Sequence, residues 1–107
     1  MGAFTVYDLE KRVHDRAAAS PDVSYTRKLL DRGVGHCAKK LGEEAVETIL
    51  AATTESRDRM IAETADLIYH LLVLLKARDI SLAEVETALA TRGSKSGLEE
   101  KAARKPG

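Results

Sequence analysis

The sequence predicts an all-α fold, a bundle of four to five helices. Aromatic residues make up only 4% of the 107 residues, so the core is built from Leu, Ile, Val and Ala, which favours helices over sheets. Apolar residues recur at spacings of three and four, and no convincing segment alternates with a period of two. A chain of this length is expected to form a single domain over residues 1–107.

The first third of the chain contains one regular helix and one irregular segment. Residues 5–19 are predicted to form the helix, capped by Thr5 or Asp8, and a Ser-Pro-Asp sequence then breaks it. The irregular segment that follows contains a short helix and ends at Gly33 and Gly35. Two glycines so close together indicate a turn with positive φ or a close backbone approach.

Three further helices are predicted in the rest of the chain. The first covers residues 36–53, and the second covers residues 57–78 with Ser56 as its N-cap. The third begins with a capping box at Ser81 and ends at the Arg-Gly pair of residues 92–93. The apolar positions of the helix at 36–53 predict its buried face, which carries Ala38, Leu41, Ala45, Ile49 and Ala52.

The overall charge and composition exclude several classes of protein. Lys and Arg number 17, as do Asp and Glu, so a protein that binds nucleic-acid phosphates is not expected. No segment has the pattern of a signal peptide or the length of a membrane span, so we expect a cytoplasmic protein with no membrane partner. The single cysteine, Cys37, cannot form an intrachain disulfide and is interpreted as a small packing residue.

An acidic stripe on the helix at 36–53 is the first functional signal. Within about a third of the helix circumference, opposite the predicted buried face, lie Lys40, Glu43, Glu44 and Glu47. Such a stripe is commonly a solvated face, and this alternative stays open. Against it, like charges three or four residues apart destabilise a helix by a few tenths of a kcal/mol per pair, so the repeated glutamates need a reason.

A second acidic cluster lies on the helix at 57–78, where Glu63, Asp66 and His70 share one stripe. The flanking residues are nearly all apolar, which predicts a central helix buried on all sides. Carboxylates on such a helix need a basic partner or a metal ion. His70 is expected to be a buried histidine that hydrogen-bonds Asp66 or the backbone, with substrate contact and metal binding as alternatives.

Placed side by side, the two helices bring four carboxylates together. Oxygen ligands without cysteine suit Mg²⁺ or Mn²⁺, and Mg²⁺ usually binds together with substrate phosphates. The pattern therefore predicts a metal site and a phosphorylated substrate. The predicted ligands are Glu44, Glu47, Glu63 and Asp66.

These motifs resemble the signature EExxE…ExxD of the all-α nucleotide pyrophosphohydrolases, the MazG-like superfamily, in Glu43-Glu44-x-x-Glu47 and Glu63-x-x-Asp66. One branch is matched in more detail, the phosphoribosyl-ATP pyrophosphatases of histidine biosynthesis. That match covers residues 4–105, although the family commonly has more arginine at residues 91–96. The further motifs that carry it are Ser24-Tyr25-Thr26, Lys39-Lys40-Leu41-Gly42 and Gly97-Leu98-Glu99-Glu100-Lys101.

The resemblance implies Mg²⁺-dependent hydrolysis of the α–β phosphoanhydride of phosphoribosyl-ATP to phosphoribosyl-AMP and pyrophosphate. This is the second step of histidine biosynthesis. The resemblance also agrees with a homodimer. We expect a homodimer because one short chain offers too little surface to cover its apolar helices. Glu43 is interpreted as a general base or as an acceptor outside the metal ligands, with a water activated by the metal ion as the alternative nucleophile.

Basic and aromatic residues complete the predicted site. Residues 92–107 form a basic C-terminal tail, interpreted either as a frayed terminus or as a segment that closes over the substrate. Lys40 is expected to reach the substrate phosphates, or else only to pair with Glu44. The predicted substrate-binding residues are Lys40, Lys39, Tyr25, Arg92, Lys95 and Lys101.

Two other functions compete with this interpretation. One is a pyrophosphohydrolase that removes free or damaged nucleoside triphosphates, and a panel of nucleotides distinguishes it. The other is a non-catalytic helical interaction module whose acidic stripe is solvated. A module of that kind shows no stabilisation by Mg²⁺ in a thermal melt.

Overall fold

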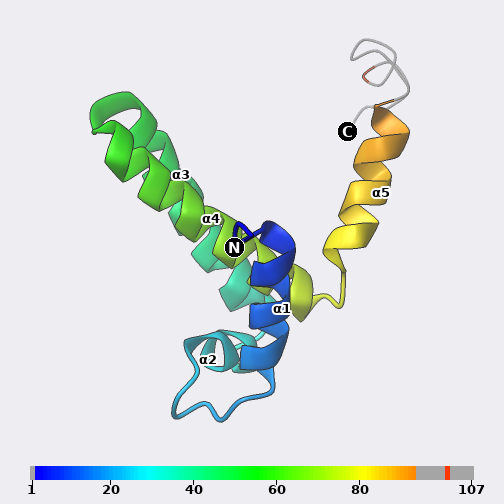
Figure 1. Ribbon diagram of the computed structural model, residues 1–107. Helices are drawn as coiled ribbons and strands as arrows, with labels where there is room; N and C mark the ends of the chain where they lie inside the picture. The colour runs from blue at the N-terminus through cyan, green and yellow to red at the C-terminus, as the bar shows by residue number, and fades with distance from the viewer. Residues whose placement is uncertain (1, 94–100, 102–107) are drawn as a thin grey trace.

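The computed structural model describes residues 2–93 and residue 101, and this part consists of five α-helices without a strand (Figure 1). The predicted all-α fold is therefore confirmed. Within the same residues, no helix combines the length and the apolar character that a membrane crossing requires. The helices are α1 (Val6–Ala17), α2 (Tyr25–Asp31), α3 (Val34–Thr54), α4 (Arg57–Ala77) and α5 (Leu82–Arg92).

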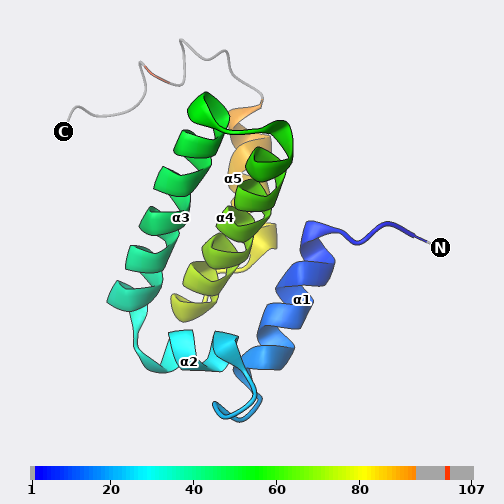
Figure 2. The same cartoon turned by 90° about the vertical axis from the view of Figure 1, so that its left-hand side faces the viewer.

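The two longest helices, α3 and α4, form an antiparallel hairpin and lie side by side in both views (Figures 1 and 2). The short helix α2 lies across the end of the hairpin where α3 begins, and α1 packs beside that end of α4. Helix α5 stands apart from α3 (Figure 1), and its first residue is tied to α1 because the Leu82 amide donates to Glu10 Oε2 at 2.7 Å. Helices α2 and α4 thus each contact the other three of the first four helices.

The helix ends follow the predicted capping signals closely. Thr5 caps α1 in a capping box with Asp8, Ser56 caps α4, and Ser81 begins α5 with its own capping box. Gly33 has φ +92 and turns the chain from α2 into α3, as predicted for one of the two glycines. The prediction is wrong for Gly35, which lies inside the first turn of α3 with neither a positive φ nor a close neighbour.

The core sits where the four N-terminal helices meet. It is formed by Val13 of α1, Leu29 of α2, Cys37 of α3, and Leu72 and Val73 of α4. The thiol of Cys37 donates to the carbonyl oxygen of Leu29 at 3.3 Å and is fully buried. The interpretation of Cys37 as a packing residue is confirmed, and the core fixes the end of the hairpin from which the site is built.

The face that α3 buries differs from the predicted one. Cys37 and Ala51 are buried against the rest of the chain, whereas Ala38, Ile49 and Ala52 are exposed. Apolar residues lie on more than one side of α3, and the single chain covers only one of these sides. The spacing of apolar residues therefore could not select which side faces α4.

Helix α4 is central but is not buried all round, so that prediction is wrong for the single chain. Ile61 is 55% exposed and Leu71 is 41% exposed. The reason is geometric, since α1 and α2 cover only the end of α4 that is near the core, and α3 covers one side. An apolar surface is left on the outside of the hairpin.

Candidate metal centre and adjoining basic pocket

Three carboxylates meet between α3 and α4. Glu44 of α3 and Glu63 and Asp66 of α4 each offer an oxygen, and these oxygens lie within 4.8 Å of one another. Glu63 is buried, Glu44 is half-buried and Asp66 is exposed. The cluster therefore has a buried floor and one side open to solvent, which is the shape that a ligand entering from outside requires.

The local sequence explains why Glu44 points into the hairpin. It lies on the same side of α3 as Leu41 and Thr48, and not opposite Leu41 as the helix pattern predicted. The hydroxyl of Thr48 lies 2.8 Å from the carbonyl oxygen of Glu44 and 3.2 Å from that of Glu63, so it links the two helices at the level of the cluster. Because the Thr48 side chain is small, α3 and α4 can approach each other closely at this level. This close approach brings the carboxylates of the two helices together.

Glu47 is the fourth carboxylate, and it lies on the exposed edge of the cluster. The adjacent carboxylate of Glu47 raises the pKa of Glu63, and burial raises it further. Burial raises the pKa of Glu44, and the charges of Glu47, Asp66 and Glu63 act in the same direction. Glu44 and Glu63 are therefore harder to ionise than isolated carboxyl groups, and a cation bound beside them would relieve that cost.

One cation already belongs to the cluster. The guanidinium of Arg59, one turn before Glu63 on α4, forms an ion pair with Glu63 Oε1, and it also contacts Glu55 at 3.5 Å. The sequence interpretation did not name Arg59, although its spacing of four residues from Glu63 is a recognisable signal for a helical ion pair. Arg59 offsets part of the negative charge, and three other carboxylates remain without a basic partner of this kind in the described part of the chain.

The oxygens that Arg59 does not reach are the test of whether a metal ion fits. In the described residues, Glu44 Oε2 and Glu63 Oε2 are buried and have no hydrogen-bond partner. Buried carboxylate oxygens are normally satisfied, so two orphaned oxygens in one cluster point to a missing partner. An all-oxygen donor set with water access suits Mg²⁺ or Mn²⁺.

His70 lies beside the cluster but not with the partner that was predicted. It is 6% exposed, and its Nε2 lies 4.0 Å from Glu44 Oε1, while Nδ1 has no hydrogen-bond partner in the described structure. The prediction of a hydrogen bond to Asp66 or the backbone is wrong, because the ring is turned across the hairpin toward α3. Burial lowers the pKa of His70 and the charge of Lys40 lowers it further, so both favour the neutral imidazole.

Lys40 and Glu43 form a pair on the outer side of the cluster. Lys40 Nζ donates to Glu43 Oε2 at 3.1 Å. This hydrogen bond lowers the pKa of Glu43, which is exposed and does not belong to the three meeting carboxylates. Lys40 therefore pairs with Glu43 and not with Glu44, and Lys39 is exposed on the same turn.

Two of the three predicted tail residues, Arg92 and Lys101, belong to the described part of the chain. Arg92 is the last residue of α5, the helix that stands apart from α3 in Figure 1. Lys95 lies outside the described residues, and Lys101 is exposed. The prediction that these residues bind substrate stays a prediction.

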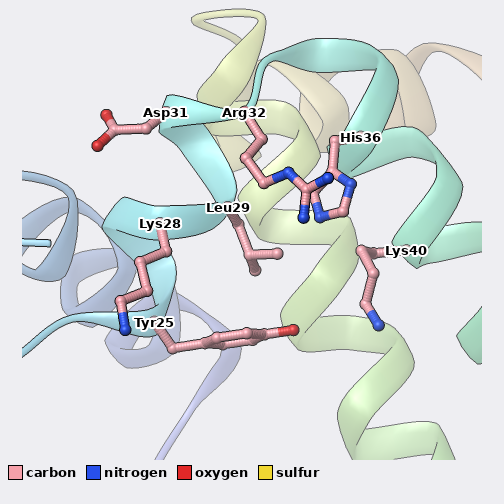
Figure 3. Close-up of a pocket in the computed structure, with 7 residues that line it drawn as sticks. All are labelled: Tyr25, Lys28, Leu29, Asp31, Arg32, His36 and Lys40. Carbon is pink, nitrogen blue, oxygen red and sulfur yellow. The ribbon is translucent and has the colours of Figure 1, made fainter.

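A basic pocket adjoins the cluster, and sequence reasoning missed most of it (Figure 3). It has a volume of about 500 Å³ and opens between α2 and α3. Its basic residues recur at every fourth position of the chain, and this spacing is the signal by which the sequence could have indicated it. The residues that line it include Tyr25, Lys28, Leu29, Arg32, His36 and Lys40.

An all-helical chain with a carboxylate cluster inside a long antiparallel hairpin defines the class: it is that of the all-α pyrophosphohydrolases. The family model described as phosphoribosyl-ATP pyrophosphohydrolase matches residues 6–93. The chain belongs to this family. The predictions of the family and of an enzyme of the hydrolase class are therefore confirmed.

Curated relatives agree over nearly the whole chain. The phosphoribosyl-ATP pyrophosphatase 1 of Bradyrhizobium diazoefficiens is 63% identical over 105 residues, which are 98% of this chain and 99% of the relative. The phosphoribosyl-ATP pyrophosphatase of Nitrobacter hamburgensis is 60% identical over 104 residues, 97% of each chain. The phosphoribosyl-ATP pyrophosphatase 1 of Rhodopseudomonas palustris is 58% identical over 105 residues, 98% of each chain.

Proposed function

We propose that this chain hydrolyses the α–β phosphoanhydride of phosphoribosyl-ATP to give phosphoribosyl-AMP and pyrophosphate, in the second step of histidine biosynthesis. The single observation that carries the chemistry is the carboxylate cluster with two orphaned buried oxygens between α3 and α4. The names of the curated relatives support the choice of substrate. Together they favour an enzyme over a helical interaction module.

The metal ligands that we propose are Glu44, Glu47, Glu63 and Asp66, with Mg²⁺ as the ion and Mn²⁺ as an alternative. When bound, Mg²⁺ supplies neutralisation of the triphosphate charge and orients the anhydride for cleavage. Arg59 holds the buried Glu63 carboxylate in place from the solvent side. Asp66 and Glu47 lie on the open side, where the substrate phosphates would arrive.

Lys40 and Glu43 are assigned to the substrate side of the site. Lys40 lies one helical turn before Glu44, and its side chain lines the basic pocket. Its Nζ is therefore placed to contact a phosphate oxygen. Glu43 holds this lysine by a hydrogen bond and keeps its own charge, because that bond lowers its pKa. A lowered pKa makes Glu43 a weak proton acceptor, so we favour its interpretation as an acceptor outside the metal ligands, which here accepts from Lys40.

The decisive experiment measures pyrophosphate release from phosphoribosyl-ATP with Mg²⁺ and with EDTA, beside ATP and dNTP controls. Release from phosphoribosyl-ATP alone, abolished by EDTA, is the expected result. Release from dNTPs instead would keep the metal site and assign the chain to the removal of free or damaged nucleotides. Release from none of them, together with a melting temperature that Mg²⁺ leaves unchanged, would overturn the proposal in favour of the interaction module.

We further propose that the active form is a homodimer. The outer side of the hairpin exposes apolar side chains on both helices, and a second copy of the same hairpin would cover them. Light scattering is expected to give twice the chain mass of 11.6 kDa, and a monomer would refute the assignment. The exposed residues are Val46, Ile49 and Leu50 of α3 and Met60, Ile61 and Leu71 of α4.

A further inference from the structure

The basic pocket between α2 and α3 carries more positive charge than its own contacts use. Lys28 and Arg32 line it, and neither side chain has a hydrogen-bond or ion-pair partner in the part of the chain that the structure describes. The one acidic residue of the wall, Asp31, is paired with Arg27 at 2.9 Å, and its carboxylate points away from the pocket (Figure 3). The two cations therefore face a space that no acidic side chain of the wall fills.

The side chain of His36 is surrounded by positive charges of the same pocket. Figure 3 shows its ring beside the guanidinium of Arg32, with the Lys40 ammonium below. Partial burial lowers the pKa of His36, and the charges of Arg32, Lys39 and Lys40 lower it further. Bringing an anion into this space would relieve the repulsion that these groups exert on one another.

Two residues of the pocket wall connect it to the carboxylate cluster by side-chain contacts. Lys40 lines the pocket and pairs with Glu43, the neighbour of Glu44 in the chain. Tyr25 forms the pocket floor in Figure 3, and its ring meets that of His70 edge to face at 6.3 Å between centroids. His70 in turn faces Glu44. A ligand held at the cluster would therefore have its other end within reach of the pocket.

We infer that this pocket binds the 5′-phosphate monoester of the ribosyl group, while the triphosphate lies at the carboxylate cluster. The inference rests on the proposed function and names the part of the site that selects phosphoribosyl-ATP over ATP. ATP has no phosphate at that end, so it leaves Arg32, His36 and Lys28 without a partner. A guanidinium is suited to this task because its planar N–H groups match two phosphate oxygens at once.

The test uses ribose 5-phosphate as a probe of the pocket, because it carries the phosphate monoester without a triphosphate. In ¹H–¹⁵N spectra of the intact protein, ribose 5-phosphate is expected to shift the amide signals of Arg32 and His36, and ribose is not. Arg32→Gln is expected to weaken ribose 5-phosphate binding on the order of tenfold, since it removes a charge-assisted contact. Binding of pyrophosphate with Mg²⁺, which reports on the cluster, should stay the same.

Steady-state kinetics with phosphoribosyl-ATP provide the second test. Arg32→Gln is expected to raise KM for phosphoribosyl-ATP about tenfold with kcat nearly unchanged, as for a contact made equally in the ground state and the transition state. Arg57→Gln, an exposed arginine in the first turn of α4 and outside the pocket, is the matched control and should leave both constants unchanged.

Two results would overturn the inference. One is an unchanged KM and an unchanged ribose 5-phosphate affinity in Arg32→Gln. The other is an equal loss of pyrophosphate binding, which would assign the pocket to the triphosphate. If the wild-type chain released no pyrophosphate from phosphoribosyl-ATP, the proposed function would fail by itself, and the ribose 5-phosphate spectra would still decide what the pocket binds.

Discussion

Helix α3 contributes to two neighbouring regions of opposite charge. The carboxylate cluster gathers Glu44, Glu63 and Asp66, and the basic pocket gathers Arg32 and His36 with their neighbours. In each region like charges raise the free energy of the empty protein, because no internal partner neutralises all of them. One ligand that carries a cation at one end and a phosphate at the other would satisfy both.

The two regions differ in how far their charged groups are exposed. The cluster has a buried floor at Glu63, which is 5% exposed, and its orphaned oxygens cannot reach solvent. The pocket is lined by long basic side chains on α2 and the start of α3, which keep their charged ends wet. The comparison teaches that the cluster suits an ion held in place by buried oxygens, whereas the pocket suits a group that enters and leaves with each substrate.

The largest expected effect tests the cluster. Asp66→Asn and Glu47→Gln each remove the charge of a proposed metal ligand and should lower the rate of pyrophosphate release on the order of a hundredfold or more. Both side chains are exposed, so the helical signal in circular dichroism and the cooperative melt should survive. Asp58→Asn, an exposed aspartate on α4 outside the cluster, is the control. Normal turnover by the folded Asp66→Asn or Glu47→Gln enzyme would refute the assignment of these ligands.

The sequence predicted the cluster better than the pocket for a physical reason. Carboxylates on an apolar helix are costly, so Glu63 and Asp66 stand out from their apolar neighbours in the sequence alone. Basic side chains on a short, irregular segment resemble ordinary solvated residues, and Lys28 and Arg32 gave no such contrast. Only the turn at Gly33 brings α2 against α3, and this turn places Lys28 and Arg32 in the same pocket as His36.

The features of the fold also differ in how well the sequence predicted them. Caps such as Ser56 and Ser81 are local features, and the sequence located them correctly because a single side chain and its own backbone decide them. The choice of buried face on α3 is not local. Both Leu41 and Ile49 belong to an apolar side of the helix, but only the side with Leu41 faces α4, and the contact that decides this comes from another segment of the chain.

Lys40 lies between the two regions and gives the next largest effect. Lys40→Ala should raise KM for phosphoribosyl-ATP about tenfold and lower kcat by less, because the role proposed for the lysine is to bind phosphate and not to take part in bond cleavage. Lys11→Ala, an exposed lysine on α1, serves as the control and should change neither constant. An unchanged KM in Lys40→Ala would count against a phosphate contact and would leave Lys40 as the partner of Glu43 alone.

Thr48 contributes to the cluster alone, and it does so by holding two helices together and not by its charge. Its hydroxyl links α3 and α4 under the cluster, and its side chain does not line the pocket. Thr48→Val should lower the free energy of unfolding by about 1 kcal/mol and reduce the stabilisation by Mg²⁺, measured by thermal melts. Thr48→Ser keeps the hydroxyl and should retain both properties more closely. Equal behaviour of the two variants would show that the link does not hold the cluster together.

The smallest effect is a pH dependence confined to the cluster. The pKa of Glu44 is raised in the folded protein above its ordinary value of 4.5, chiefly by burial, so the folded state binds this proton more tightly than the unfolded state does. Its contribution to stability is therefore full below pH 4.5 and is lost as the pH rises through the folded value. Glu44→Gln removes that loss, so the metal-free variant should gain stability over the wild type between about pH 4.5 and pH 7.

Denaturant melts of both proteins in EDTA at several pH values measure this difference directly. The gain of Glu44→Gln should vanish near about pH 4, where the wild-type carboxyl is protonated, and saturating Mg²⁺ should reverse the order at neutral pH by stabilising the wild type more. His36→Gln offers a comparison from the basic pocket, since this variant should not show the reversal by Mg²⁺. A stability difference between Glu44→Gln and the wild type that is independent of both pH and Mg²⁺ would mean that crowding of carboxylates plays no part at this site.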